Sequence, residues 1–471
     1  MSDRIKHLSI VSSIILVLAL FLKRNYDLKL TERLMHVHDG LIRAEQKIQL
    51  QHRTKVGVGF GGCHDAFLPA LEAWKGLQLT PSNELVHHNL INNKTELEQL
   101  FNYFFYHGAA VERYVKNPEF FKEIVSFAKS YADTRWHVGG NAPVMAQRLA
   151  MEGSDVLLGA RKSPNVLFGD NVKGIGDQDE DDVHVILEYD KNEVWGNITT
   201  PRANRLIVHS DQYNPMLNMI EEFEVELKKF QPRLFVLGGL QMMDNFPFEE
   251  GVRSSRFLVL QNFLSAMPTS TLIHFEMASF AEEDLVHELI DKVLPYADSL
   301  GMNEQELPNI LAVLNKKPVQ LVADSNPRVV TALDDIRELF RAVGNLNGSR
   351  RLTRVHVHTL AYQAVVTVKG SPWKNTMSAA AKSALVANRH VCGNSTINLE
   401  KARIILDESF RSSRIEGSER IFLKDERPVS CWEENDMLFC VAPNLVCTHI
   451  FQTGGGGDNI SAAGLSLQIV D

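Results

Sequence analysis

Short apolar runs alternate with amphipathic stretches from about residue 50 onward, and this alternation constrains the fold more than any other feature of the chain. Brief apolar runs are typical of strands that are buried on both faces of a sheet, and intervening helices return the chain for parallel pairing. The pattern therefore predicts an α/β fold whose central, mainly parallel sheet is flanked by helices. The expected strands are Lys55–Gly59, Val156–Leu158, Val183–Tyr189, Arg205–Ser210, Leu234–Leu237, Thr271–Phe275, Pro318–Val322, Arg354–His358 and Ala364–Lys369, and the expected helices are Gln212–Phe230, Arg253–Ala266, Glu282–Ala297 and Leu333–Ala342.

Two stretches interrupt this alternation and indicate a smaller α/β lid domain. The lid is expected to comprise residues 66–137 and 160–205, and the large domain residues 51–65, 138–159 and 206–471. The second lid stretch contains the acidic run 177–182. A charge run of this kind is typical of a solvated loop, with a metal-binding cluster as the less favoured alternative.

Composition excludes several classes of protein. Hydrophobic residues make up 44% of the 471 residues, enough for a large core, and a net charge of −9 gives no basic surface for nucleic acid. The five cysteines contain no C-x-x-C pair, so no structural zinc is expected. Buried free thiols are favoured, and one disulfide among Cys392, Cys431, Cys440 and Cys447 is the alternative in an oxidising compartment.

The uncharged segment Leu8–Leu22 is flanked by basic residues, the layout of a signal peptide or signal anchor within residues 1–24. Residues 25–50 are then expected to form a stalk or first helix. This layout predicts the endoplasmic reticulum lumen with N-terminal membrane association, or secretion if the segment is cleaved, and a buried soluble helix is the alternative. Glycosylation sequons occur at Asn93, Asn197, Asn347 and Asn394, and they support a lumenal location only weakly.

A first glycine cluster spans Gly57 to Gly62 and formally contains the dinucleotide pattern G-x-G-x-x-G. That fingerprint needs a helix to begin at the glycines, and Pro69 with the Pro-Ser-Asn stretch at 81–83 fits this poorly. The favoured alternative is a tight turn that presents Asp65 to a polar ligand.

A second cluster places Gly454, Gly455, Gly456 and Gly457 directly before Asp458 and a helix-prone segment. Bare backbone N–H groups at a helix N-terminus form an anion site. Asp458 alone could be a helix cap. Four consecutive glycines exceed what capping needs, so close approach of a phosphoryl group is the preferred interpretation.

The sequence Gly455-Gly456-Gly457-Asp458 resembles the G-x-G-D motif of the ribokinase superfamily, in which the aspartate takes a proton from a sugar hydroxyl. Further motifs resemble the ADP-dependent glucokinase family, animal type, over about residues 52–471, and the resemblance implies a ribokinase-like large domain with a lid. These motifs are His274-Phe275-Glu276, Asn303-Glu304-Gln305-Glu306, Pro201-Arg202-Ala203-Asn204-Arg205, Gly238-Gly239-Leu240-Gln241-Met242-Met243 and Val355-His356-Val357-His358-Thr359-Leu360.

The same resemblance implies the sugar-binding residues. Asp65 matches the sugar-binding aspartate that closes the first strand, and Gly140 and Asn141 match a glycine-asparagine pair at a helix start. Glu112 and His184 match lid residues that contact glucose. This chain departs from the family pattern at Gly61 or Cys63, at His64 and at Gln241, which leaves its affinity for glucose less defined than its reaction.

For the phosphate end, the resemblance implies that Gly455, Gly456, Gly457 and Arg205 act with Asp458 in catalysis. Arg205, or alternatively Arg202, is expected to reach the nucleotide phosphates, and Gly457 and His358 are expected to contact the nucleotide. The implied metal residues are Glu276, Glu306 and Asp458, which would organise Mg²⁺, in part through water.

The implied reaction is Mg²⁺-dependent transfer of the β-phosphoryl group of ADP to the 6-hydroxyl of D-glucose, which releases AMP, by a monomeric enzyme. One alternative is an ADP-dependent phosphofructokinase, although Glu112 suits a neutral sugar better than a phosphorylated one. The other is a membrane-anchored sugar or nucleotide sensor that has lost catalysis, against which Asp458, Glu276 and Glu306 count.

Overall fold

The computed structural model describes residues 2–48, 52–82, 84–160, 169–175, 182–280, 282–317, 324 and 326–470. Within these residues the large sheet consists of ten strands in the order β19-β20-β15-β14-β13-β12-β11-β1-β5-β6. The seven strands from β14 to β6 are parallel, and β15, β20 and β19 extend the sheet by antiparallel pairing. The bounds are β1 Lys55–Gly59, β5 Asp155–Gly159, β6 Val172–Ile175, β11 Leu234–Leu237, β12 Leu272–Glu276, β13 Ser299–Asn303, β14 Arg354–His358, β15 Tyr362–Val368, β19 Ser430–Glu434 and β20 Met437–Pro443. The expected mainly parallel α/β fold is confirmed.

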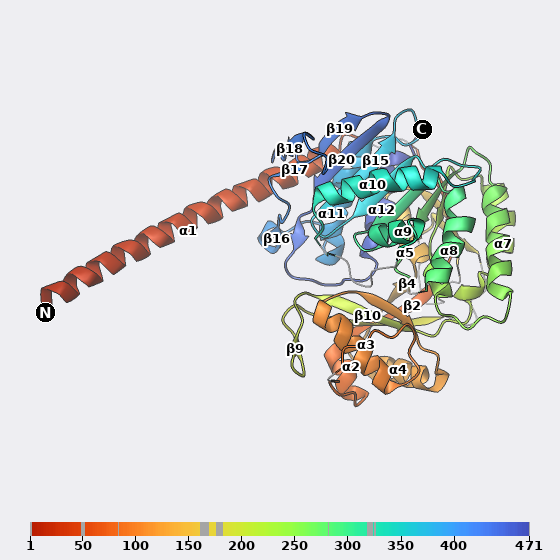
Figure 1. Ribbon diagram of the computed structural model, residues 1–471, viewed down its shortest axis with the longest axis horizontal. Helices are drawn as coiled ribbons and strands as arrows, with labels where there is room; N and C mark the ends of the chain where they lie inside the picture. The colour runs from red at the N-terminus through yellow and green to blue at the C-terminus, as the bar shows by residue number, and fades with distance from the viewer. Residues whose placement is uncertain are drawn as a thin grey trace.

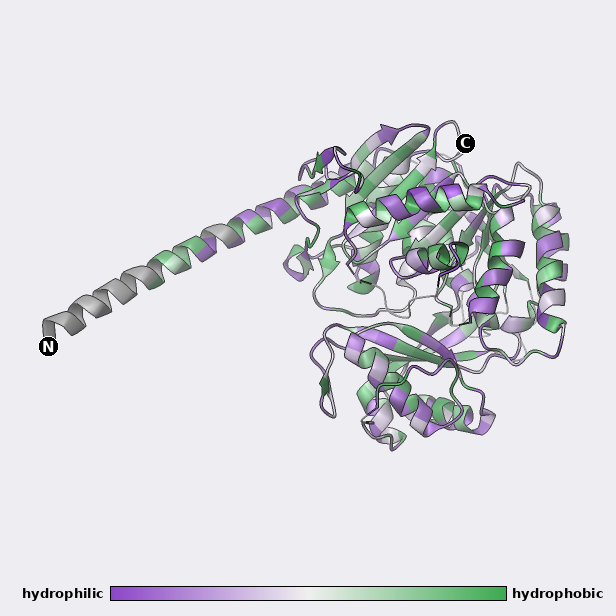
Figure 2. Cartoon of the chain, viewed as in Figure 1, coloured by the Kyte–Doolittle hydropathy of each residue, from purple (hydrophilic) through white to green (hydrophobic). Residues whose placement is uncertain are grey.

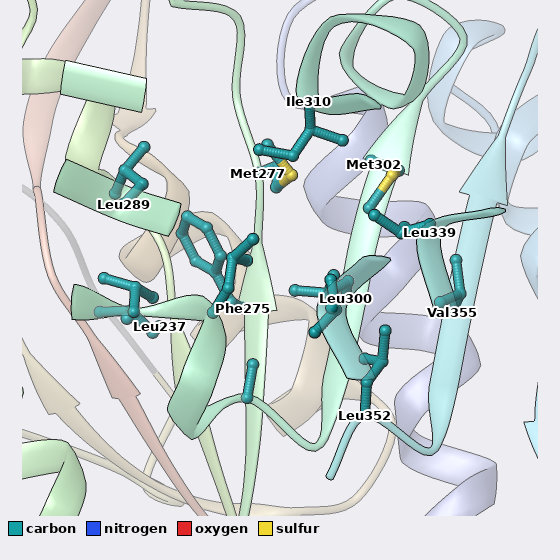
Figure 3. Packing of buried hydrophobic residues seen from close by; sticks show 14 of the residues in the cluster. Leu237, Phe275, Met277, Leu289, Leu300, Met302, Ile310, Leu339, Leu352 and Val355 are labelled. Atoms are coloured by element: carbon teal, nitrogen blue, oxygen red, sulfur yellow. The ribbon is translucent and has the colours of Figure 1, made fainter. Parts of the chain in front are cut away.

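Helices cover both faces of this sheet, because alternate residues of each strand point to opposite sides. Phe235 and Leu237 of β11 pack in one cluster with α6 to α10, whereas Leu234 and Val236 pack in another with α5 and α12. Figure 3 shows the first cluster, with Phe275 and Leu300 side by side on neighbouring strands and Leu289 on a helix near Phe275. The helices are α5 Asn141–Met151, α6 Ile220–Phe230, α7 Val252–Ser265, α8 Glu283–Lys292, α9 Glu306–Leu314, α10 Val329–Gly344, α11 Thr376–Val391 and α12 Gly456–Gln468. In Figure 2 these outer helices carry hydrophobic and hydrophilic residues in alternation, as one-sided burial requires.

A second sheet of five strands, in the order β3-β10-β7-β2-β4, lies apart from the first in Figure 1. One face packs on helices through Ala66, Val185, Leu187, Leu206 and Val208. The intervening residues of the same strands therefore face the large domain. The strands are β2 Cys63–Pro69, β3 Val111–Tyr114, β4 Arg135–Gly139, β7 Val183–Tyr189 and β10 Asn204–His209, and the helices are α2 Ala70–Gly76, α3 Lys94–His107 and α4 Pro118–Ser130.

Several lid boundaries in the structure differ from those expected from the sequence. The strand β6 lies inside the expected lid span 160–205, yet it pairs with β5 at the edge of the large sheet. The strands β2, β4 and β10 each lie wholly in the smaller sheet, although the expected boundaries divided them. Asp65 consequently does not close the first strand, because it lies within β2 of the smaller sheet. The direct step from β1 to β2 also rules out the dinucleotide fingerprint, which requires a helix there.

Three further expectations differ from the structure. The segment 299–303 forms β13, which the sequence pattern missed, and the expected helix 212–230 begins only at Ile220. The acidic run was expected to be solvated, but its last residue, Asp182, is buried and accepts backbone hydrogen bonds from Gln212 and Asn214. The rest of that run and the expected strand 318–322 lie outside the described residues.

The cysteines form two disulfides where free thiols were favoured. Cys431 and Cys440 face one another on β19 and β20, with their Cα atoms 4.2 Å apart. Cys392 at the end of α11 is bonded to Cys447, with a Cα separation of 5.7 Å. Cys63 is a buried free thiol. No sequence pattern marks these pairs, because Cys431 and Cys440 face one another only through the register of β19 and β20, and Cys392 and Cys447 lie 55 residues apart in the chain.

The first helix, α1 (Ser2–Glu45), projects from the large domain in Figure 1. Its C-terminal part is anchored, because Leu34, Val37 and Leu41 are buried in a cluster with residues of α11. Among the described residues, no helix has both the length and the hydropathy that a membrane crossing requires.

Candidate active site

A cavity of about 410 Å³ lies between the two sheets. Glu276, Asn303 and His358 are the last residues of β12, β13 and β14 and line its large-domain side, at the strand ends where open α/β sheets bind ligands. The cavity brings together all the site residues expected from the sequence: Asp65, Glu112, Gly140, Asn141, His184, Arg205, Glu276, Glu306, His358, Gly455, Gly456, Gly457 and Asp458. Arg202, the alternative to Arg205, is not among the lining residues.

The glycine turn leads directly into α12. Gly455 has a φ of 67°, in the left-handed region that favours glycine, and helix α12 begins at the next residue. A Cβ atom on Gly457 would lie 2.8 Å from Cε1 of His358, so a side chain there would collide with the imidazole. The turn thus exposes helix N-terminal amides to the cavity, and its geometry is that of an anion site.

Asp458 is held by a chain of side-chain amides. Nδ2 of Asn141, at the start of α5, donates to Oδ1 of Asp458 over 2.8 Å, and Nε2 of Gln241 donates to Oδ1 of Asn141. Burial raises the pKa of Asp458 to about 7, with a further contribution from the negative charge of Glu276. Gln241, which departs from the family pattern, therefore orients Asn141, and Asn141 in turn orients the carboxylate of Asp458.

Two carboxylates and one imidazole from the smaller sheet also line the cavity. Asp65 and His184 are register partners on β2 and β7, and Nδ1 of His184 lies 3.5 Å from Oε1 of Glu112 on β3. Burial raises the pKa of Asp65 to about 6, although the charge of His184 opposes this shift. A Cβ atom on Gly139 would lie 1.8 Å from Oδ1 of Asp65, so this glycine makes room for the carboxylate.

A buried carboxylate that the sequence analysis did not single out supports His184. Oδ1 of Asp211 lies 2.8 Å from Nε2 of His184 and 3.2 Å from Nδ1 of His209. Burial alone would lower the pKa of His184, but the charge of Asp211 together with Glu112 raises it to about 10. The position of Asp211 shortly after a predicted strand was the only available signal.

A third group of acidic side chains lies near the glycine turn. Glu276 accepts hydrogen bonds from the imidazoles of His274 (2.8 Å) and His358 (3.2 Å) and from Oγ of Ser461 (2.9 Å). These bonds outweigh burial and lower the pKa of Glu276 to about 2. A Cβ atom on Gly301 would lie 2.0 Å from Oε2 of Glu276, so β13 needs a glycine at this point.

Glu306 begins α9 and is held by the preceding turn. Its two oxygens accept from the backbone and side-chain nitrogens of Asn303, each over 2.8 Å, and Oδ1 of Asn303 accepts from the backbone N–H of Glu306. This reciprocal arrangement is a capping box. Burial raises the pKa of Glu306 to about 7, and the nearby charges of Glu276 and Glu304 contribute to the rise.

Arg205 is the cation of the cavity that is best placed for an anion. It lies on β10, opposite Glu188 of β7, and its side chain lines the cavity. Its Nε atom is buried and has no hydrogen-bond partner among the described residues. A buried guanidinium nitrogen without an acceptor is costly, and a phosphate oxygen would satisfy it.

The sequence analysis also missed an apolar wall of the cavity. Ala387 and Val391 of α11, together with Leu445, Val446 and Ile450, form this wall, and the disulfide between Cys392 and Cys447 joins its two segments. No sequence motif marks it, because its apolar residues look like ordinary core residues until the two segments are brought together.

Together, the ribokinase-like architecture, the glycine turn at a helix N-terminus and the buried carboxylate beside it define a phosphotransferase of the small-molecule kinase class. The chain matches the ADP-specific Phosphofructokinase/Glucokinase conserved region over residues 54–467 and belongs to that family.

Relatives and solved structures agree with this assignment. The chain is 34% identical over 420 residues to the ADP-dependent glucokinase of Bos taurus, covering 87% of this chain and 84% of the relative. It is 30% identical over 430 residues to a probable ADP-dependent glucokinase of Caenorhabditis elegans, with the same coverage of 87% and 84%. A solved ADP-dependent kinase in complex with fructose-6-phosphate and ADPbetaS shares the fold, with a TM-score of 0.64 and 18% identity over 93% of this chain and 97% of that one.

Proposed function

We propose that this protein transfers the β-phosphoryl group of ADP to the 6-hydroxyl of D-glucose, giving glucose 6-phosphate and AMP. The observation that carries the proposal is that Asp458, beside the glycine turn, lines the same cavity as the group Asp65, Glu112 and His184. The glucokinase relatives, at 34% and 30% identity over most of the chain, favour glucose as the acceptor.

Asp458 acts as the general base. Asn141 occupies its Oδ1, so Oδ2 is the oxygen that accepts the proton of the attacking hydroxyl. The hydroxyl oxygen forms the new bond to the β-phosphorus, and the bond from phosphorus to the bridging oxygen breaks with its electron pair leaving on AMP. A pKa of about 7 is well matched to this task at neutral pH.

The transferring group is stabilised by the amides of Gly455, Gly456 and Gly457 and by Arg205, whose buried Nε needs an acceptor. Such donors act where charge develops in the transition state. The apolar wall formed by α11 and the segment 445–450 is suited to the nucleobase, because a flat apolar ring can bury its faces there. His358, held by Glu276, lies against the glycine turn beside Gly457.

The residues present fit Mg²⁺. Each oxygen of Glu306 accepts one hydrogen bond from Asn303 and retains a lone pair for a metal-bound water. Glu276 adds negative charge near Glu306, and Glu276 also acts on Asp458. Glu306 and Glu276 would hold the ion chiefly through water, as Mg²⁺ prefers. When bound, Mg²⁺ neutralises charge on the donor oxygens.

Two carboxylates at the sugar end disfavour a phosphorylated acceptor. Asp65 and Glu112 are hydrogen-bond acceptors for neutral hydroxyls, and they would repel the phosphate of fructose 6-phosphate. The two candidate reactions are distinguished by measuring ADP-dependent phosphorylation of glucose and of fructose 6-phosphate with the same preparation. Preference for glucose supports the proposal, and preference for fructose 6-phosphate would replace it with the phosphofructokinase reaction.

We further propose that the basic and apolar N-terminal sequence directs the chain to the endoplasmic reticulum. The two disulfides support an oxidising compartment, because such bonds persist there and are rare in the cytosol. Localisation of the full chain with a tag at its C-terminus tests this, and a cytosolic distribution would contradict it.

A further inference from the structure

One side chain of the smaller sheet reaches the segment that leads into the glycine turn. Oε1 of Glu188, on β7, accepts from the backbone N–H of Thr453 over 2.9 Å and from Oγ1 of Thr453 over 3.1 Å. Thr453 lies two residues before Gly455, which precedes the first turn of α12. A residue 265 positions away in the sequence thus holds the chain at the entrance of the phosphate-binding turn.

A second residue fixes Glu188 in this position. Oε2 of Glu188 pairs with Nη2 of Arg135, on β4, over 2.7 Å. The Arg135 guanidinium lies over the ring of Phe451, 4.7 Å from its centroid. Phe67 of β2 closes the other side, because a Cβ atom on Gly454 would lie 2.8 Å from its Cε1 atom. Residues 451–454 are therefore bracketed by β2, β4 and β7.

The strands that make these contacts also carry the sugar-facing residues. Asp65 lies two residues before Phe67 on β2, and His184 lies four residues before Glu188 on β7. A strand is stiff over such distances, so the sugar-facing side chains and Glu188 move together. Any displacement of the smaller sheet relative to the large domain must break the bonds to Thr453 or carry the turn with it.

We propose that Glu188 is a positioning residue, which holds the glycine turn in its phosphate-binding geometry only while the smaller sheet occupies its sugar-binding position. The catalytic consequence rests on the proposed function, and Glu188 itself touches neither substrate. Glu188 lies outside the residues that line the cavity, and it acts through Thr453. Misplacement of phosphate-binding amides by about 1 Å is enough to slow transfer, because catalysis depends on their alignment.

The test uses the full chain with the changes Glu188→Ala, Glu188→Gln and Thr453→Val. Glu123→Ala is the matched control, because Glu123 forms an ion pair with Lys94 over 2.6 Å on the helical side of the smaller domain, remote from the cavity. The measurements are kcat, the KM values for both substrates, the glucose Kd without nucleotide and the melting temperature.

Glu188→Ala is expected to lower kcat by about tenfold or more, the size expected for hydrogen bonds to a charged group, while the glucose Kd changes by less than about threefold. Glu188→Gln keeps an oxygen acceptor for Thr453 and should restore kcat to within about threefold of the wild type. Thr453→Val loses one of the two hydrogen bonds, so its kcat should lie between those of the wild type and Glu188→Ala. Combining Thr453→Val with Glu188→Ala should lower kcat no further than Glu188→Ala alone. A kcat for Glu188→Ala equal to that of Glu123→Ala, or equal losses in the Ala and Gln variants, would overturn the inference.

Amide hydrogen exchange in the absence of substrates gives a second readout that needs no activity. Segment 451–457 should exchange faster in Glu188→Ala and Thr453→Val than in the wild type or Glu123→Ala. Unchanged exchange refutes the positioning role, whereas a wild type that fails to phosphorylate glucose refutes the proposed function instead.

Discussion

The side-chain amide of Asn141 donates to Oδ1 of Asp458 over 2.8 Å, and this bond joins the N-termini of α5 and α12 at the surface of the cavity. It leaves one carboxylate oxygen for a proton acceptor and prevents the side chain from rotating toward the helix amides. If Asp458 were only a helix cap, its carboxylate would face the amides of α12. The bond to Asn141 instead holds the carboxylate at the cavity.

Replacement of Asp458 by Asn should lower kcat by about 10²–10⁴-fold, the usual contribution of a general base. Binding of ADP and glucose should persist, because the glycine amides and the sugar-facing residues are unchanged. Turnover, ligand affinity and melting temperature should be measured on the same preparation. Near-normal turnover would reduce Asp458 to a structural role.

Replacement of Glu112 by Ala should weaken glucose binding by about 1.5–3 kcal/mol, as expected for the loss of a hydrogen bond to a charged acceptor. The ADP affinity should change little, because Glu112 lies beside His184 on the smaller sheet, whereas the glycine turn belongs to the large domain. Titration calorimetry with each ligand checks both statements, and an unchanged glucose Kd would remove Glu112 from the sugar site.

Glucose affinity should decrease as the pH is lowered through about 6, because burial raises the pKa of Asp65 to that value. Only the ionised carboxylate accepts hydrogen bonds at both oxygens. His184 stays protonated in this range, since its pKa is about 10. Between pH 7.5 and pH 5 the glucose Kd should rise by about tenfold. The same titration of Asp65→Asn should give weak binding that is flat across this range, and a flat profile in the wild type would contradict the assignment.

Loss of the Asp211 charge should destabilise the fold by about 3–5 kcal/mol, because it leaves buried imidazoles without their partner. The pKa of His184 in the folded state, about 10, lies above its unfolded value, so this stabilisation is complete below about pH 6.5 and is lost as pH rises through 10. The difference in melting temperature between the wild type and Asp211→Asn should therefore be large at pH 6 and shrink toward pH 10. A difference that grows with pH would contradict the charged pair.

Local spacing allowed much of the fold to be predicted, whereas most of the site residues were expected from the family resemblance. Four glycines before Asp458 mark a helix N-terminus by themselves, and strands such as β7 and β14 were predicted with their exact bounds because short apolar runs are distinctive. What failed depends on contacts between distant residues. The disulfide between Cys392 and Cys447, the apolar wall beside α11 and the hydrogen bond that Thr453 donates to Glu188 each join segments that have no common pattern in the sequence.

Asp65 illustrates an intermediate case. The residue was predicted to contact sugar but was placed at the end of the first strand, because a glycine-rich turn normally ends a strand. The chain instead enters a second sheet at once, and Gly139 provides the space that the carboxylate needs. Its place at the cavity was expected from the resemblance, whereas its strand depended on pairing with β4 and β7.

The account is tested most directly by following glucose 6-phosphate and AMP together, with ADP, CDP and ATP as separate donors. If the glycine amides hold the β-phosphate, the γ-phosphate of ATP would occupy the space where the sugar hydroxyl attacks. We predict one AMP per glucose 6-phosphate with ADP and far slower turnover with ATP. Faster turnover with ATP, or glucose 6-phosphate formed without AMP when ADP is the donor, would contradict the account.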